Sequence, residues 1–231
     1  MNNIQGIAAS PGIAIAKAYR LITPDLSFNH RKTKHPEKEV ERLKDALNRS
    51  IQEIEKIKAH TLEELGEEHA EIFSAHLLIL KDQEFIQPIQ EKITAEEATA
   101  EAAVEEVSDM FIEIFQNMDD EYMRERAADI KDVTKRILAH LLGVTLPNPK
   151  LIDEEVIIIA DDLTPSDTAQ LNLQYVKGFV TNIGGRTSHS AIMARSLEIP
   201  AVVGTKEITT SASQDDLIII DGNEGIVIVQ P

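Results

Sequence analysis

The residues with the clearest capacity for chemistry lie between positions 184 and 195, in the string GGRTSHSAIMAR. An apolar run that predicts a strand precedes this string, and its second half predicts a helix. Thr187 or Ser188 could cap that helix, which would leave its first backbone N–H groups pointing outward and place His189 in the first turn. A helix N-terminus favours a bound anion and disfavours protonation of a nearby imidazole.

A neutral imidazole is a nucleophile, whereas an imidazolium is not, so we predict that His189 accepts a phosphoryl group. Phosphoryl oxygens could be held by the N–H, hydroxyl and guanidinium groups of the residues just before it, namely Gly185, Arg186, Thr187 and Ser188. Arg186 could equally be a solvated loop residue. A single histidine near a helix start is more often a capping or surface residue, so the hypothesis depends on the complete string.

The elements that would position this string form an α/β layer. Residues 151–231 contain short Ile- and Val-rich runs, with helices predicted at 188–197 and after the capping sequence Thr164-Pro165-Ser166-Asp167. Alternation of strands and helices predicts a layered α/β domain. Residues 1–22, with two predicted strands around Ser10-Pro11-Gly12, would join it, giving a discontinuous domain of residues 1–22 and 147–231.

Residues 36–143 predict an inserted, all-helical subdomain. Apolar residues recur there at spacings of three or four, which predicts four helices packed as hairpins or a bundle. Gly66 is predicted to separate the first two helices, Pro88 to bend or end a short helix, and Thr94 to cap the next. The region holds 27 of the 40 acidic residues, so it carries most of the negative charge.

The second predicted helix has apolar side chains on an acidic face. Apolar residues within a charged rim suggest a protein-docking patch, although a helix buried on both sides would show the same pattern. The predicted partner-binding residues are Glu67, Glu68, Glu71, Leu78, Ile79, Asp82 and Glu84. His69 and His76 are seven residues apart, about 10 Å along a helix, which is too far for one metal ion. We therefore expect no metal site.

Composition excludes several classes of protein. The 231 residues include no Cys, which excludes disulfides, a thiolate zinc site and a thiol nucleophile. A net charge of −17 disfavours binding to nucleic acid. The longest apolar runs are about five residues, far below the ~20 needed to cross a bilayer, and the N-terminus lacks the pattern of a signal peptide. We expect a soluble, cytoplasmic protein that does not bind membranes.

The segment GGRTSHSAIMARSLEIPAVVGT resembles the phosphohistidine signature of Enzyme I of the bacterial sugar phosphotransferase system, the phosphoenolpyruvate–protein phosphotransferases. Residues 9–14, 119–129 and 162–171 resemble further motifs of that family. The resemblance implies an enzyme in which His189 takes a phosphoryl group from phosphoenolpyruvate on Nε2 and passes it to the histidine phosphocarrier protein HPr. It also implies that Thr168 orients the histidine, although an ordinary helical threonine is as good an interpretation.

The same resemblance implies that the acidic helical subdomain binds HPr, whose matching surface is basic. Arg126 would contact HPr or form an intramolecular salt bridge. The family also has a C-terminal domain that binds phosphoenolpyruvate and Mg2+, and this chain resembles only the N-terminal half. We therefore expect no cofactor within the chain, no use of phosphoenolpyruvate by the chain alone, and a monomer.

Two other classes compete with this interpretation. Pyruvate phosphate dikinases and phosphoenolpyruvate synthases carry a similar string, but they pair it with a nucleotide-binding region, and no Gly-rich phosphate loop occurs here. A non-catalytic binding module would use the helical face and leave His189 idle. Incorporation of phosphate from the phosphorylated carrier would distinguish a phosphoryl-transfer enzyme from a non-catalytic binding module.

Overall fold

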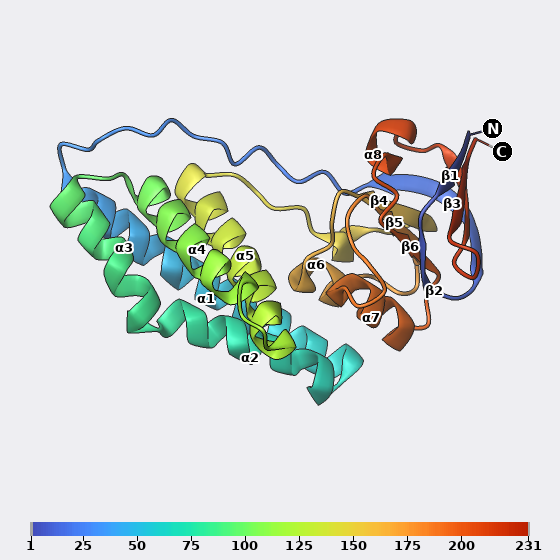
Figure 1. Ribbon diagram of the computed structural model, residues 1–231, viewed down its shortest axis with the longest axis horizontal. Coiled ribbons are helices and arrows are strands. Elements are labelled where there is room, and N and C mark those ends of the chain that lie inside the picture. Colours follow the sequence, from blue (N-terminus) through green and yellow to red (C-terminus); the bar gives the residue numbers. More distant parts are fainter. Residues whose placement is uncertain (1, 231) are drawn as a thin grey trace. The chain divides into compact units, whose positions relative to one another are not determined.

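The computed structural model describes residues 2–230, and the side chains of Asn2, Glu121, Tyr122 and Glu125 lie outside what it describes. The last three belong to the motif at 119–129. The chain forms two compact units (Figure 1). The α/β unit comprises Met1–Thr23 and Pro147–Pro231, and the helical unit comprises Pro24–Leu146.

Within residues 2–230, the α/β unit contains one eight-stranded sheet with the order β1-β8-β7-β3-β4-β5-β6-β2. Strands β3, β4, β5 and β6 are parallel, and the other pairs are antiparallel. The strands are β1 (Asn2–Gln5), β2 (Ile7–Ser10), β3 (Ile13–Arg20), β4 (Val156–Ala160), β5 (Val176–Thr181), β6 (Ala201–Val203), β7 (Leu217–Asp221) and β8 (Ile226–Val229). The N-terminal segment thus supplies three strands, where the sequence predicted two, because the chain shifts from β8 to β6 as its partner at Gly6.

Both faces of the sheet are buried at its parallel centre. All five residues of β4 are buried, which is typical of a parallel strand covered on both sides. One core includes Leu163 and Leu171, which flank α6 (Pro165–Ala169), together with residues of α7 (His189–Ser196). The other core includes Ile208 of α8 (Ile208–Ser211). The two helices that carry Thr168 and His189 therefore pack on the same face of the sheet.

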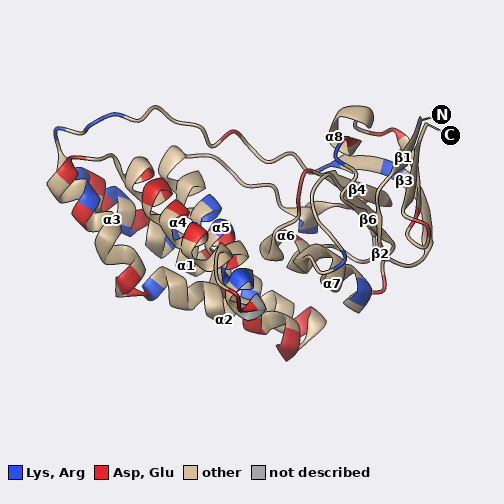
Figure 2. Cartoon of the chain, viewed as in Figure 1, with Lys and Arg blue, Asp and Glu red and all other residues tan. Residues whose placement is uncertain are grey.

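The helical unit contains five α-helices among the described residues. Four correspond to the predicted apolar stripes, and the fifth is the short helix predicted around Pro88. They are α1 (Pro36–Leu65), α2 (Glu67–Lys81), α3 (Gln83–Glu96), α4 (Ala100–Gln116) and α5 (Glu121–Leu142). Gly66 separates α1 from α2, as predicted. Asp and Glu residues recur along these helices (Figure 2).

Two predicted helix boundaries in this unit, an end at Pro88 and an N-cap at Thr94, are wrong. Pro88 lies inside α3, because Phe85, Ile89 and Ile93 bury one face of the helix and this packing outweighs the lost backbone hydrogen bond. Thr94 does not cap the next helix. Its hydroxyl donates to Gln90 O at 2.9 Å within α3, and Thr99 occupies the N-cap of α4.

A partly buried ion cluster joins three helices of this unit. Arg42 of α1 donates to Glu39 and to Glu101 of α4, and it reaches Leu141 O of α5 at 3.0 Å. The carboxylate of Glu101 raises the pKa of Arg42. No helix between residues 2 and 230 combines the length and hydrophobicity needed to cross a membrane.

Candidate active site

His189 is the first residue of α7, and Ser188 is the N-cap. The Ser188 hydroxyl oxygen accepts from the Ala191 N–H at 3.3 Å and donates to Gly185 O at 2.8 Å. Of the two predicted caps, Ser188 therefore caps the helix, and Thr187 is exposed. The first backbone N–H groups of an α-helix have no carbonyl partner within the helix. The first turn of α7 therefore brings backbone N–H donors close to the imidazole of His189.

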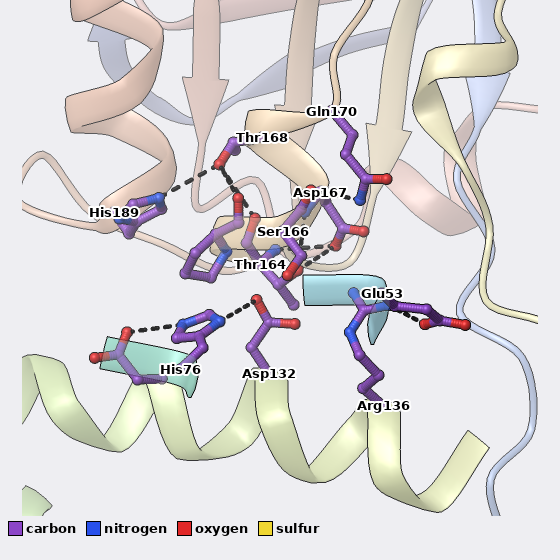
Figure 3. A network of polar contacts seen from close by, with 12 residues as sticks. Glu53, His76, Asp132, Arg136, Thr164, Ser166, Asp167, Thr168, Gln170 and His189 are labelled. Atoms are coloured by element: carbon purple, nitrogen blue, oxygen red, sulfur yellow. Dashed lines mark hydrogen bonds and ion pairs between the residues drawn. The ribbon is translucent and has the colours of Figure 1, made fainter. Parts of the chain in front are cut away.

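Thr168 lies beside the imidazole of His189. Its Oγ1 is 3.3 Å from His189 Nε2, and it is also 3.2 Å from Thr164 O and 3.0 Å from Pro165 O (Figure 3). The side chain of Thr168 is almost fully buried, at 1% exposure. The hydroxyl can donate to Nε2, or it can turn to a carbonyl and accept from Nε2–H, so it orients the ring in either tautomer.

The position of Thr168 follows from the start of α6. Thr164 Oγ1 accepts from the Asp167 N–H at 3.1 Å, and Asp167 Oδ2 accepts from the Thr164 N–H at 3.0 Å. This reciprocal pair is the capping box that the sequence predicted. Since all five residues of α6 are buried, the short helix holds Thr168 rigidly against the sheet.

The segment between β5 and α7 leaves room for another group to approach its backbone closely. Gly184 has φ +117°, which favours glycine, and a Cβ there would lie 3.3 Å from Ser188 Oγ. Nothing lies within 4 Å of where a Gly185 Cβ would stand. Arg186 and Thr187 are exposed, so the predicted phosphate-binding residues line an open segment directly before His189.

A hydrophobic pocket of about 320 Å³ lies in the helical unit. Its lining residues are Leu78, Ile79, Asp82, Glu84, Phe85, Phe111, Phe115, Met123, Arg126 and Ile130. Five of the predicted partner-binding residues are among them. Leu78 is 67% exposed at the pocket, so the alternative of a helix buried on both sides is wrong at this position.

The remaining predicted partner-binding residues lie elsewhere on α2. Glu67, Glu68 and Glu71 are exposed in its first two turns and do not line the pocket. The structure therefore divides the predicted set into a pocket group and an acidic group on one helix.

Comparison with known proteins identifies the chain. Residues 5–126 match the model described as PEP-utilising enzyme, N-terminal, and residues 152–225 match PEP-utilising enzyme, mobile domain. The chain belongs to the PEP-utilising enzymes. The match to the mobile domain includes both Thr168 and His189.

Among PEP-utilising enzymes, the chain is similar to phosphoenolpyruvate-protein phosphotransferases. It is 63% identical over 228 residues to the protein of Geobacillus stearothermophilus and 59% identical over 231 residues to that of Bacillus subtilis. These alignments cover 99% and 100% of this chain but 39% and 40% of the relatives. The chain thus spans about two fifths of their length and corresponds to their N-terminal portion.

Two solved structures share the fold of this chain. A solution structure of Enzyme I (nEIt) has a TM-score of 0.86 and 48% identity, and the match covers 99% of this chain and 93% of that chain. The N-terminal domain of Enzyme 1 – Nitrogen has a TM-score of 0.64 and 29% identity, with coverage of 99% and 94%. The predicted α/β class with a helical portion agrees with these relatives.

Sequence reasoning missed the aromatic lining of the pocket. The spacing of apolar residues in this helix predicts that Phe111 and Ile114 belong to one buried stripe. The stripe is buried only in the first half of α4, and Ile114 is 48% exposed. The sequence signal for this lining is the run of residues 110–115, in which five of six residues are aromatic or aliphatic. One buried helix face needs fewer apolar residues than this, so some of them must lie on another face.

His76 is fully buried within the helical unit. Its Nε2 lies 3.3 Å from Asp129 Oδ1, and its Nδ1 lies 4.0 Å from Asp132 Oδ2 (Figure 3). Among residues 2–230, no group of three or more histidine or carboxylate side chains is arranged to hold a metal ion.

Proposed function

We propose that this chain is the phosphoryl-carrying portion of the phosphoenolpyruvate–protein phosphotransferase of the sugar phosphotransferase system. His189 carries a phosphoryl group that originates from phosphoenolpyruvate and passes it to a histidine of HPr. The observation that carries this proposal is the contact between Thr168 Oγ1 and His189 Nε2 at the start of α7. This contact presents one nitrogen of an oriented imidazole at the N-terminus of α7, where an anion is favoured.

The proposed reaction is an in-line displacement at phosphorus. In the resting site the Thr168 hydroxyl donates to Nε2, and the proton of a neutral His189 is then on Nδ1. When the phosphoryl group arrives, the hydroxyl turns to Thr164 O or Pro165 O and frees the Nε2 lone pair. With phosphoenolpyruvate as donor, the bond from Nε2 to phosphorus forms as the bond from phosphorus to the enol oxygen breaks. In the reverse transfer from phospho-HPr, the bond that breaks is the one from phosphorus to the carrier's imidazole.

The surroundings of His189 support this step through position and charge. The exposed hydroxyl of Thr187 and the positive end of the α7 dipole would stabilise the equatorial oxygens of the phosphoryl group. The Ser188 hydroxyl would have to give up its bond to Gly185 O before it could donate to them. The helix dipole is held before the reaction, so it stabilises developing charge without reorganisation. Gly185 leaves room on the open side for the oxygens to approach the backbone.

The helical unit would hold HPr at the pocket lined by Leu78, Ile79 and Phe111. An apolar side chain of HPr would fill it, because an interface core is apolar and its rim polar. Asp82, Glu84, Glu67, Glu68 and Glu71 would attract a basic partner surface and increase the association rate. Arg126 at the pocket would pair with an acceptor on HPr.

In the whole enzyme, the first step takes the phosphoryl group from phosphoenolpyruvate, and this step would need the remaining part of the longer relatives. The longer relatives are PEP-utilising enzymes, and we assign phosphoenolpyruvate and Mg2+ to their C-terminal domain. No step proposed for this chain uses a metal. As part of the same proposal, the chain acts in the cytoplasm as a monomer and exchanges phosphate reversibly with HPr.

The test uses the purified chain and 32P-labelled phospho-HPr. We expect rapid, acid-labile and base-stable labelling of one peptide that contains His189. Phosphoenolpyruvate with Mg2+ should not label the chain directly. His189→Ala should remove the label, and His140→Ala is the matched control because its histidine belongs to the helical unit. Labelling that survives His189→Ala, or none in the wild type, would overturn the proposal.

A further inference from the structure

We propose that Arg195 is a positioning residue for the phosphoryl-accepting segment, defined as residues 184–188. Its guanidinium bridges this segment to the N-terminal motif at residues 9–12, which the proposed chemistry does not otherwise use. The inference rests on the proposed function and adds a residue that sets the geometry of the same site.

The bridge consists of two hydrogen bonds from one side chain. Arg195 Nη1 donates to Ala9 O at 2.8 Å, and Nη2 donates to Arg186 O at 3.0 Å. Arg195 lies in the last turn of α7, so it leaves the helix that carries His189 and reaches back to the segment before it. The planar guanidinium holds the two carbonyls in a fixed relation, which the single ammonium of lysine does not do.

The end of the bridge at Ala9 is a rigid support. Ala9 and Ser10 are 4% and 2% exposed, and both belong to β2. The Gly222 N–H donates to Gly12 O at 2.8 Å, and a Cβ at Gly222 would overlap Ser10 O. The turn after β7 therefore packs directly on the backbone of the motif and fixes the Ala9 carbonyl.

The other end needs an external support. Arg186 and Thr187 are exposed, and no atom outside the neighbouring residues lies within 4 Å of a Cβ built at Gly185. The bond from Ser188 Oγ to Gly185 O is local and fixes only the preceding peptide. Arg195 thus adds a restraint on the Arg186 carbonyl from outside the segment.

Fixing that carbonyl also fixes a donor. A trans peptide is planar, so the N–H of Thr187 points opposite to the C=O of Arg186. By holding Arg186 O, Arg195 sets the direction of the Thr187 N–H, the donor two residues before His189. Displacing a donor or a nucleophile by about 1 Å can reduce the rate of a reaction about 100-fold.

The experiment compares Arg195→Gln and Arg195→Lys with the wild type in single-turnover transfer from phospho-HPr. We expect Arg195→Gln to slow transfer at least about 10-fold, with Arg195→Lys between the two. The dissociation constant for HPr should stay within about twofold, because the pocket lies in the helical unit. Arg20→Gln is the matched control, since Arg20 donates to Thr209 O at 2.8 Å in the same unit but not to residues 184–188.

A second measurement separates this inference from the proposed function. The amide signal of Thr187 in 1H–15N spectra of the unphosphorylated chain should shift in Arg195→Gln and stay in place in Arg20→Gln. An unchanged Thr187 amide would overturn the bridge, whatever the outcome of labelling. Transfer by Arg195→Lys at the wild-type rate would also overturn it, because charge alone would then suffice. A wild type that is never phosphorylated, with the amide shift present, would refute the proposed function and leave the bridge as a structural contact.

Discussion

Replacing Thr168 by valine should slow phosphoryl transfer without weakening the binding of HPr. Valine keeps the shape of the side chain and removes only the hydroxyl that lies 3.3 Å from His189 Nε2. A hydrogen bond of this kind contributes about 1 kcal/mol net, and leaving a buried partner without it costs up to about 3 kcal/mol. Since about 1.4 kcal/mol is a tenfold change in rate, we expect transfer to fall about 5- to 150-fold.

Rapid-quench transfer from phospho-HPr measures this rate, and calorimetry of HPr binding supplies the affinity. Thr168→Ser is the matched control, because serine keeps the hydroxyl and should retain most of the rate. Thermal unfolding must be followed as well, since Thr168 also contacts Thr164 O and Pro165 O and its loss should cost about 1 kcal/mol of stability. A Thr168→Val rate equal to that of wild type would refute the orienting role.

Three further predictions concern docking and stability. A variant in which Glu67, Glu68 and Glu71 are replaced by Lys should transfer phosphate to and from HPr more slowly than the wild type at low salt. Stopped-flow measurements should show that this difference disappears at high salt. Gly222→Ala should lower the free energy of unfolding by about 2 kcal/mol or more, since the new Cβ would overlap Ser10 O, and an unchanged urea midpoint would contradict this. Hydrogen bonds from Gln230 and Ser213 lower the pKa of Asp216. The ionised carboxylate of Asp216 therefore stabilises the folded chain fully above pH 3.8, the pKa in the unfolded chain, and this stabilisation is lost as pH falls through the lowered pKa. Asp216→Asn should therefore unfold with a weaker acid dependence below pH 3.8, and an unaltered acid dependence would count against this.

The local signals of the α/β unit were predictable from sequence. Ser188 caps α7 and the box of Thr164 and Asp167 caps α6 because these bonds join residues three apart. Signals in the helical unit failed at Pro88 and Thr94, where packing between helices overrides local preference.

The geometry of the site depends on contacts that sequence spacing does not encode. Thr168 and His189 are 21 residues apart and lie on different helices, so their contact follows from the packing of α6 and α7 on one face of the sheet. The role of Thr168 was implied by the family resemblance alone. The pocket likewise needs Leu78, Phe111 and Met123 from three helices, and no periodicity places those helices next to one another.

The most direct test of the central claim is the position of the phosphorus on the phosphorylated chain, determined by 31P and 15N NMR of the imidazole nitrogens. The account predicts one phosphohistidine, at Nε2 of His189, with Nδ1 carrying no phosphorus. Phosphorus on Nδ1, or on any other residue of the chain, would contradict it.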